Sequence, residues 1–111
     1  MDELELEPES DGLANFEVGT DPDGNAVVTI SGELDISGVD ALEARIAPVL
    51  ERPPARLIVD VSGLRFADSS AIALWVRWAT QVEDFELRHP TPLLGRVVAG
   101  MGLTDKLGVR P

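Results

Sequence analysis

The chain alternates between short apolar segments with strand character and longer segments with helical spacing. Residues 13–18 and the β-branched run Ala26-Val27-Val28-Thr29-Ile30-Ser31 flank Asp21-Pro22-Asp23-Gly24-Asn25, whose composition predicts a turn. These two segments are therefore expected to form a β-hairpin, which Gly32-Glu33-Leu34-Asp35 then leaves.

A first helix is predicted after this hairpin, with Ser37 as its N-cap and Asp40 in a capping-box position three residues on. Its apolar stripe comprises Val39, Leu42, Ile46, Val49 and Leu50. Pro48 lies inside that stripe, where an interior proline costs about 3 kcal/mol, so a kink or an early end is expected. Pro53-Pro54 stop the helix in any case.

The second half of the chain repeats the alternation. The clearest strand spans residues 55–61, and its continuous apolar run is typical of a central strand. A turn through Asp68-Ser69-Ser70 leads into an apolar helix that ends near Gln81, and residues 85–88 form a further short strand. Thr91-Pro92 begins a last helix that ends at Gly100 or Gly102, and residues 103–109 return to the sheet or pack beneath it.

This order predicts the α/β class, with one domain built on a mixed, partly parallel sheet of about four to five strands. Three or more helices would pack on the sheet. Successive strand-helix-strand units place the turn at Asp68 and Ser69 at one end of the sheet, where the ligand and partner sites of such folds often lie.

Charge is distributed unevenly over the 111 residues, whose formal net charge is −11. Residues 1–12 hold six acids and no base, which predicts a mobile, disordered acidic leader before a folded domain at residues 13–111. Such a balance repels nucleic acids and anionic membrane surfaces. No apolar run is long enough to span a membrane, and the acidic start does not match a signal peptide, so a cytoplasmic location is expected.

The most informative chemistry is the pair of hydroxyls at Ser69 and Ser70 beside Asp68, at the start of a helix. Unpaired N–H groups make a helix N-terminus favourable for anions, although serine in that place is most often only a cap. In the helix that follows, Trp75 is expected in the core. Leu74 and Trp78 lie at one margin of the apolar arc, where they either pack on a neighbouring helix or form part of a partner-binding surface.

Enzyme chemistry finds little support in the sequence. His89 is the only histidine, and nothing places it beside Ser69 as a catalytic triad would require. The chain has no nucleophile-elbow, P-loop, zinc-protease or dinucleotide-binding pattern, and the absence of cysteine excludes disulfides and thiolate-bound metals. We therefore expect a non-enzyme that needs no cofactor and no metal.

Three segments together resemble the STAS domain of bacterial anti-sigma factor antagonists. They are residues 27–35, ending in Gly-Glu-Leu-Asp; residues 57–64, Leu-Ile-Val-Asp-Val-Ser-Gly-Leu; and residues 66–70, Phe-Ala-Asp-Ser-Ser. Residues 97–107 also look like the last helix of that family and the segment after it. The similarity extends from about Phe16 to Val109.

The resemblance implies a partner switch that binds a kinase-type anti-sigma factor and is turned off by phosphorylation, which a phosphatase reverses. It implies that Ser69 is the phosphoacceptor and that Asp68, Asp35 and Ser70 lie at the partner face, with Ser70 as the helix cap. Alanines at positions 71 and 73 stand where antagonists usually carry glycine. Two other functions remain open: a STAS scaffold or regulatory subunit of a transporter or stress-signalling complex, and a small-ligand or nucleotide sensor. The sequence does not predict the oligomeric state.

Overall fold

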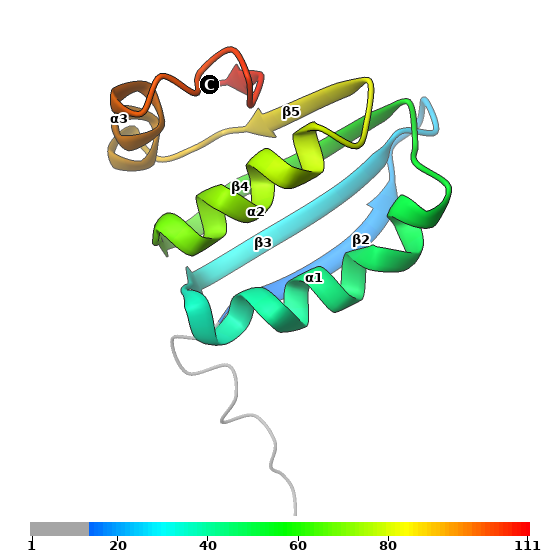
Figure 1. The fold of residues 1–111 in the computed structure, drawn as a ribbon, viewed down its shortest axis with the longest axis horizontal. Helices are drawn as coiled ribbons and strands as arrows, with labels where there is room; N and C mark the ends of the chain where they lie inside the picture. The colour runs from blue at the N-terminus through cyan, green and yellow to red at the C-terminus, as the bar shows by residue number, and fades with distance from the viewer. Residues whose placement is uncertain (1–13) are drawn as a thin grey trace, which may run out of the picture.

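A computed structural model describes residues 14–111, which form a five-stranded sheet covered by helices (Figure 1). The strands are β2 (Asn15–Thr20), β3 (Ala26–Leu34), β4 (Arg56–Ala67), β5 (Asp84–Arg88) and β6 (Val109–Arg110). The helices are α1 (Ile36–Glu51), α2 (Ser69–Ala79) and α3 (Pro92–Gly100). The predicted α/β class and mixed sheet are confirmed. The predicted leader at residues 1–12, and the domain boundary after it, lie outside the described residues and stay predictions.

The sheet begins with the predicted hairpin. β2 runs antiparallel to β3, with Phe16 opposite Ile30. Asp21 closes the turn, because its Oδ1 accepts the backbone N–H groups of Asp23 and Asn25, both at 2.9 Å. A short aspartate side chain that bonds its own turn in this way is the reason such sequences reverse the chain.

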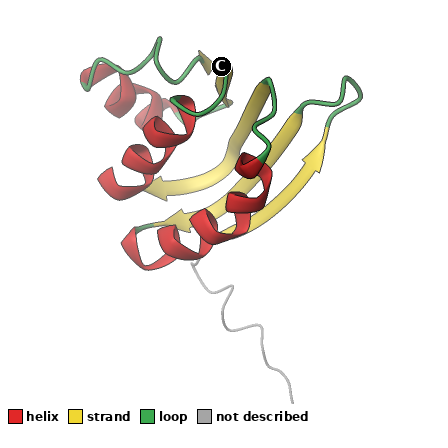
Figure 2. Cartoon of the chain, turned by 45° about the vertical axis from the view of Figure 1, so that its right-hand side comes forward, coloured by secondary structure: helices red, strands yellow, loops and turns green. Residues whose placement is uncertain are grey.

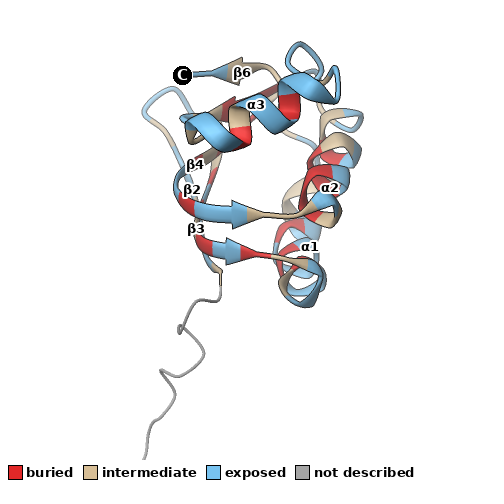
Figure 3. Ribbon diagram, turned by 90° about the vertical axis from the view of Figure 1, so that its left-hand side faces the viewer, coloured by how far each residue is buried: buried red, intermediate tan, exposed pale blue. Residues whose placement is uncertain are grey.

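Every later strand joins the sheet in parallel, and the strand order follows the chain order, β2-β3-β4-β5-β6. Parallel neighbours need a crossover, and α1, α2 and α3 are the three crossovers. Helices α1 and α2 lie side by side on one face of the sheet, as Figures 2 and 3 show.

The hydrophobic core fills the space between the sheet and these helices. It draws alternate residues from each central strand, because successive side chains point to opposite faces of the sheet. They are Ala26, Val28 and Ile30 from β3, Leu57, Val59 and Val61 from β4, and Phe85 and Leu87 from β5. Its largest fully buried members are Trp75, Trp78, Ile30, Leu34, Leu42 and Ile46.

Strands β3 and β4 are longer than the sequence pattern predicts. β3 includes the Gly-Glu-Leu segment up to Leu34, and β4 continues through Phe66 to Ala67, which pairs with Leu34. Two register shifts interrupt this stretch. The shorter predictions rested on the β-branched run at residues 26–31 and the apolar run at residues 55–61, and neither run extends into this irregular stretch. Gly32 lies at one of the register shifts with φ of 90°, a conformation that glycine adopts without a steric penalty.

Helix α1 does not end early at Pro48, so that alternative is wrong. The helix continues to Glu51 with Pro48 inside it, because the proline removes one backbone hydrogen bond and the packing of the helix on the sheet offsets that cost. Packing of Val39, Leu42 and Ile46 against the sheet holds the helix in place. No helix within residues 14–111 has the length and apolarity to cross a membrane.

Candidate functional site

Two strands end, and two helices begin, at one end of the sheet, where the carboxyl ends of β3 and β4 lie; we call this place the edge below. The backbone N–H of Asp68 donates to the carbonyl oxygen of Leu34 at 3.2 Å, which ties the end of β4 to the end of β3. Helices α1 and α2 start immediately after these residues, at the left of Figure 1. The structure therefore brings the motif Gly-Glu-Leu-Asp and the motif Asp-Ser-Ser together at this end of the sheet.

Asp68 is the centre of the hydrogen bonding at this edge. Its Oδ1 accepts the N–H groups of Ser70 at 3.0 Å and Ala71 at 3.3 Å and the hydroxyl of Ser70 at 2.5 Å. Its Oδ2 accepts the N–H of Ile36 at 3.2 Å, which is the first residue of α1. One carboxylate therefore serves the N-termini of both helices. The Ser70 hydroxyl, followed by these backbone donors, holds the pKa of Asp68 below its ordinary value despite partial burial.

Asp35 has the matching position on α1. Its Oδ1 accepts the N–H of Ser37 at 3.0 Å and the hydroxyl of Ser37 at 2.6 Å. The structure thus corrects both predicted caps: Asp35 caps α1 in place of Ser37, and Asp68 caps α2 in place of Ser70. Each serine donates its hydroxyl to the aspartate two residues before it.

The physical reason is that an ionised carboxylate is a stronger acceptor than a hydroxyl at a positive helix end. A signal for this arrangement was available in the sequence. The spacing Asp-x-Ser occurs three times: Asp60-Val61-Ser62 lies inside β4, whereas the copies at Asp35 and Asp68 come directly after a strand, and aspartate ranks with serine as a cap.

Ser69 is the first residue of α2 and is exposed, whereas Ser70 is half-buried and bonded to Asp68. The two hydroxyls therefore have different surroundings and different roles. Ser70 supports the aspartate cap, and Ser69 presents its hydroxyl to solvent. Asp68 directly precedes Ser69 in the chain, and its bond to Ile36 brings the residue after Asp35 to the same place.

Leu74 and Trp78 do not belong to this exposed edge. Their side chains are 0% and 1% exposed, so their assignment to a partner surface is wrong and the alternative of packing inside the domain is correct. The reason is that α1 and α2 are neighbours on the same face of the sheet, and the margin of α2 is covered.

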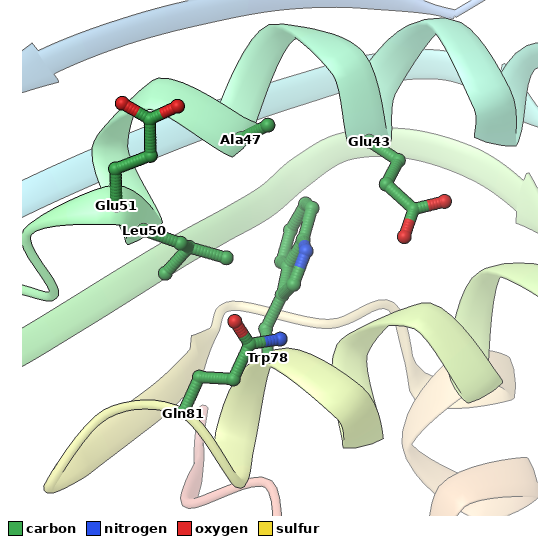
Figure 4. Close-up of a pocket in the computed structure, with 6 residues that line it drawn as sticks. All are labelled: Glu43, Ala47, Leu50, Glu51, Trp78 and Gln81. Carbon is green, nitrogen blue, oxygen red and sulfur yellow. The ribbon is translucent and has the colours of Figure 1, made fainter.

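Figure 4 shows Trp78 beside a hollow of about 260 Å³ between the C-terminal halves of the two helices. Its other lining residues are Glu43, Ala47, Leu50, Glu51 and Gln81. This hollow lies at the opposite ends of the helices from Asp35 and Asp68.

His89 lies apart from the serine pair. Its ring Nδ1 is 4.0 Å from Oδ2 of Asp60, in the middle of β4, and its backbone N–H donates to Arg110 at 2.7 Å. Within residues 14–111 there is also no group of three or more ligand-type side chains that could hold a metal ion.

Comparison with known proteins identifies this architecture. The family model described as "Mlab, STAS domain" matches residues 18–109. No curated protein sequence matches the chain.

Three solved structures are similar to the whole fold. An anti-sigma factor antagonist from Mycobacterium paratuberculosis is 27% identical, with a TM-score of 0.80 over 88% of this chain and 86% of the other. Unphosphorylated SpoIIAA, an anti-sigma factor antagonist, is 22% identical, with a TM-score of 0.74 over 87% and 89%. Phosphorylated SpoIIAA, a Bacillus cell fate determinant, is 22% identical, with a TM-score of 0.69 over 87% and 92%. The chain thus has the fold of these regulators, and by its match over residues 18–109 it belongs to the STAS domain family.

Proposed function

We propose that this chain is a cytoplasmic anti-sigma factor antagonist, without enzymatic activity, that binds a kinase-type anti-sigma factor. Phosphorylation of Ser69 would end the binding, and a phosphatase would restore it. The observation that carries the proposal is the exposed hydroxyl of Ser69 on an edge where the two family motifs meet. The similarity to an antagonist at 27% identity, and to SpoIIAA in both phosphorylation states, supports it.

The charge arrangement supports a switch that acts at the interface. A phosphate on Ser69 would add about −1.5 to −2 charges. The N–H groups of Ser70, Ala71 and Ile36 already donate to Asp68, and a phosphate on Ser69 would not break these bonds. The positive N-terminus of α2 would offset part of the repulsion between the phosphate and the Asp68 carboxylate. The added charge would therefore act mainly on whatever approaches the edge from solvent.

The electrostatic repulsion that a phosphate on Ser69 would add is large enough to switch binding off. Two unit charges about 4 Å apart interact by roughly 4 kcal/mol at an effective dielectric constant near 20. Loss of only about 1.4 kcal/mol of binding free energy weakens an interaction tenfold. A partner carboxylate near Ser69 would supply more than this.

The test is titration calorimetry with a purified kinase-type anti-sigma factor from the organism that encodes this chain. Ser69→Ala should bind like the wild type and should take up no phosphate from the kinase and ATP. Ser69→Glu should bind at least about tenfold more weakly, with a nearly unchanged melting temperature. Thr20→Glu is the matched control, because it adds the same charge at an exposed position at the hairpin end of the sheet. Equal affinities for all four proteins would reject Ser69 as the switch.

A second candidate function is a STAS subunit that holds its partner without being phosphorylated, in a transporter or stress-signalling complex. The observation in its favour is the family model, whose description names Mlab rather than an antagonist. Mass spectrometry after incubation with the kinase and ATP separates the two functions. Stoichiometric phosphate on Ser69 supports the switch, and an unmodified protein in a stable complex supports the subunit.

A further inference from the structure

Strand β4 has an open edge next to Ser69. β5 pairs with β4 only from Arg56 to Asp60, whereas β4 continues to Ala67 with β3 as its one neighbour. No backbone hydrogen bond links residues 63–67 to α3 or to the loop before it among the described residues. A strand edge with free N–H and C=O groups is a template on which another strand can pair.

A groove runs along this open edge, with α3 as its other wall. We call it the β4–α3 groove; it is lined by residues 64–67 and by Thr91, Leu93, Leu94 and Val97. Its volume is about 130 Å³. An apolar cavity of about 150 Å³ can hold a benzene molecule, so one large apolar side chain would fill the groove.

The groove exposes most of the large apolar side chains that the described surface carries. Phe66 is 51% exposed, Leu93 61% and Val97 42%. Leu93 and Val97 lie on one side of α3, one turn apart, and Figure 3 shows the exposed side of this helix. A contiguous exposed apolar patch of this kind typically marks an interaction site.

The charges at the rim favour an acidic partner. Arg65 lines the groove and is 3.7 Å from Glu33, but both side chains are at least half exposed, so this pair contributes little. Arg96 follows Leu93 by three residues on α3 and forms no ion pair within residues 14–111. Asp68, which directly follows the groove-lining residues 64–67, already accepts four donors.

We propose that the β4–α3 groove binds an extended segment of the anti-sigma partner, with one apolar side chain in the groove and acidic residues beside it. The segment adds to β4 as a strand along residues 63–67. Backbone pairing supplies the contact area, and the apolar side chain supplies the selectivity. This inference rests on the proposed function, because its occupant belongs to the same partner. It also explains how phosphate at Ser69, two residues beyond Ala67, repels that partner.

The first test measures binding of the same anti-sigma factor to the double variant Leu93→Ser/Val97→Ser. Both positions are exposed, so the fold should be retained, which thermal melting checks. Affinity should fall by about tenfold or more. Ala99→Ser is the matched control, an exposed position on the same helix that does not line the groove, and should bind like the wild type. Arg65→Ala should also weaken binding.

The second test follows amide hydrogen exchange by NMR in the complex. Alternate residues among 63–67 should gain protection, because their N–H groups donate to the added strand. Unchanged exchange there would overturn strand addition, even if the double variant binds weakly. Unchanged affinity of the double variant, with Ser69→Glu still weakened, would overturn the groove and leave the switch in place.

If Ser69→Glu also binds like the wild type, the proposed function fails. A concentration-dependent dimer in sedimentation equilibrium that the double variant abolishes would assign the groove to a second copy of the chain, and this would also overturn the inference.

Discussion

Removal of the Asp68 carboxylate should destabilise the domain more than removal of an ordinary helix cap. Asp68 caps α2 through Ser70 and Ala71 and also accepts the N–H of Ile36 at the start of α1. Loss of an aspartate cap costs typically about 1 kcal/mol. A hydrogen bond to a charged group contributes about 1.5–3 kcal/mol where it is well formed, and the 3.2 Å bond to Ile36 belongs at or below the lower end. We therefore expect Asp68→Ala to lower the free energy of unfolding by roughly 2 kcal/mol.

Asp35→Ala is the matched control, since within residues 14–111 the Asp35 side chain bonds only to Ser37, on its own helix. It should cost about 1 kcal/mol. Urea denaturation followed by circular dichroism measures both losses, and the difference between them isolates the link between the two helices. In thermal melting, 1 kcal/mol corresponds to about 4–8 °C for a domain of this size, so the two variants should be clearly resolved.

The pH dependence of the free energy of unfolding gives a second, independent measure of the bonds that Asp68 makes. The pKa of Asp68 is lower in the folded protein than in the unfolded chain, so its charged form stabilises the fold. That contribution is present above the unfolded pKa of about 3.9 and is lost as pH falls through the folded pKa. The stability gap between the wild type and Asp68→Asn should therefore narrow below about pH 4. If Asp68→Ala costs no more than Asp35→Ala, or if the gap is constant with pH, the reasoning about a shared cap is refuted.

Two further predictions concern a tryptophan in the core and a buried carboxylate in β5. The Nε1 of Trp75 is buried without a hydrogen-bond partner among the described residues. Trp75→Phe should therefore change the free energy of unfolding by no more than about 1 kcal/mol. Trp75→Ala should cost about 3–5 kcal/mol, and urea denaturation measures both variants. Burial pushes the pKa of Glu86 upward, but hydrogen bonds and charge from Arg88 and Arg56 outweigh it, so the folded pKa is lowered. Glu86→Gln should cost about 1.5–3 kcal/mol at pH 7 and progressively less as pH falls below about 4.5, and a deficit that does not change with pH would contradict the ion-pair explanation.

The sequence was sufficient for the architecture because each element carried its own periodic signal. The β-branched run before Gly32, the continuous apolar strand that ends near Val61 and the Thr91-Pro92 helix start are all local patterns, and the structure has the corresponding elements. Parallel pairing followed from the alternation of strands and helices. A helix between two strands makes a connection long enough to cross over and return the chain in the same direction.

The errors came from interactions that no single segment contains. Strand β4 extends to Ala67 because Leu34 pairs with it from another strand, although the local alternation has already been broken by register shifts. Trp78 is buried because α1 lies beside α2, which the helical arc of α2 alone does not reveal. The link from Asp68 to Ile36 joins residues 32 positions apart, so only the folded sheet brings them together.

The arrangement of the candidate site assigns the stability of the two helix starts and the proposed switch to different side chains. Asp68 uses both of its oxygens on donors from two helices, and Ser70 adds its hydroxyl to the same carboxylate. Ser69 lies between these two residues in the chain and is exposed, so its side chain can be altered without breaking those bonds. A charge added at Ser69 should therefore change the free energy of folding only slightly. In the proposed switch, the added charge would act mainly on a partner bound at this surface and in the β4–α3 groove only a few residues away.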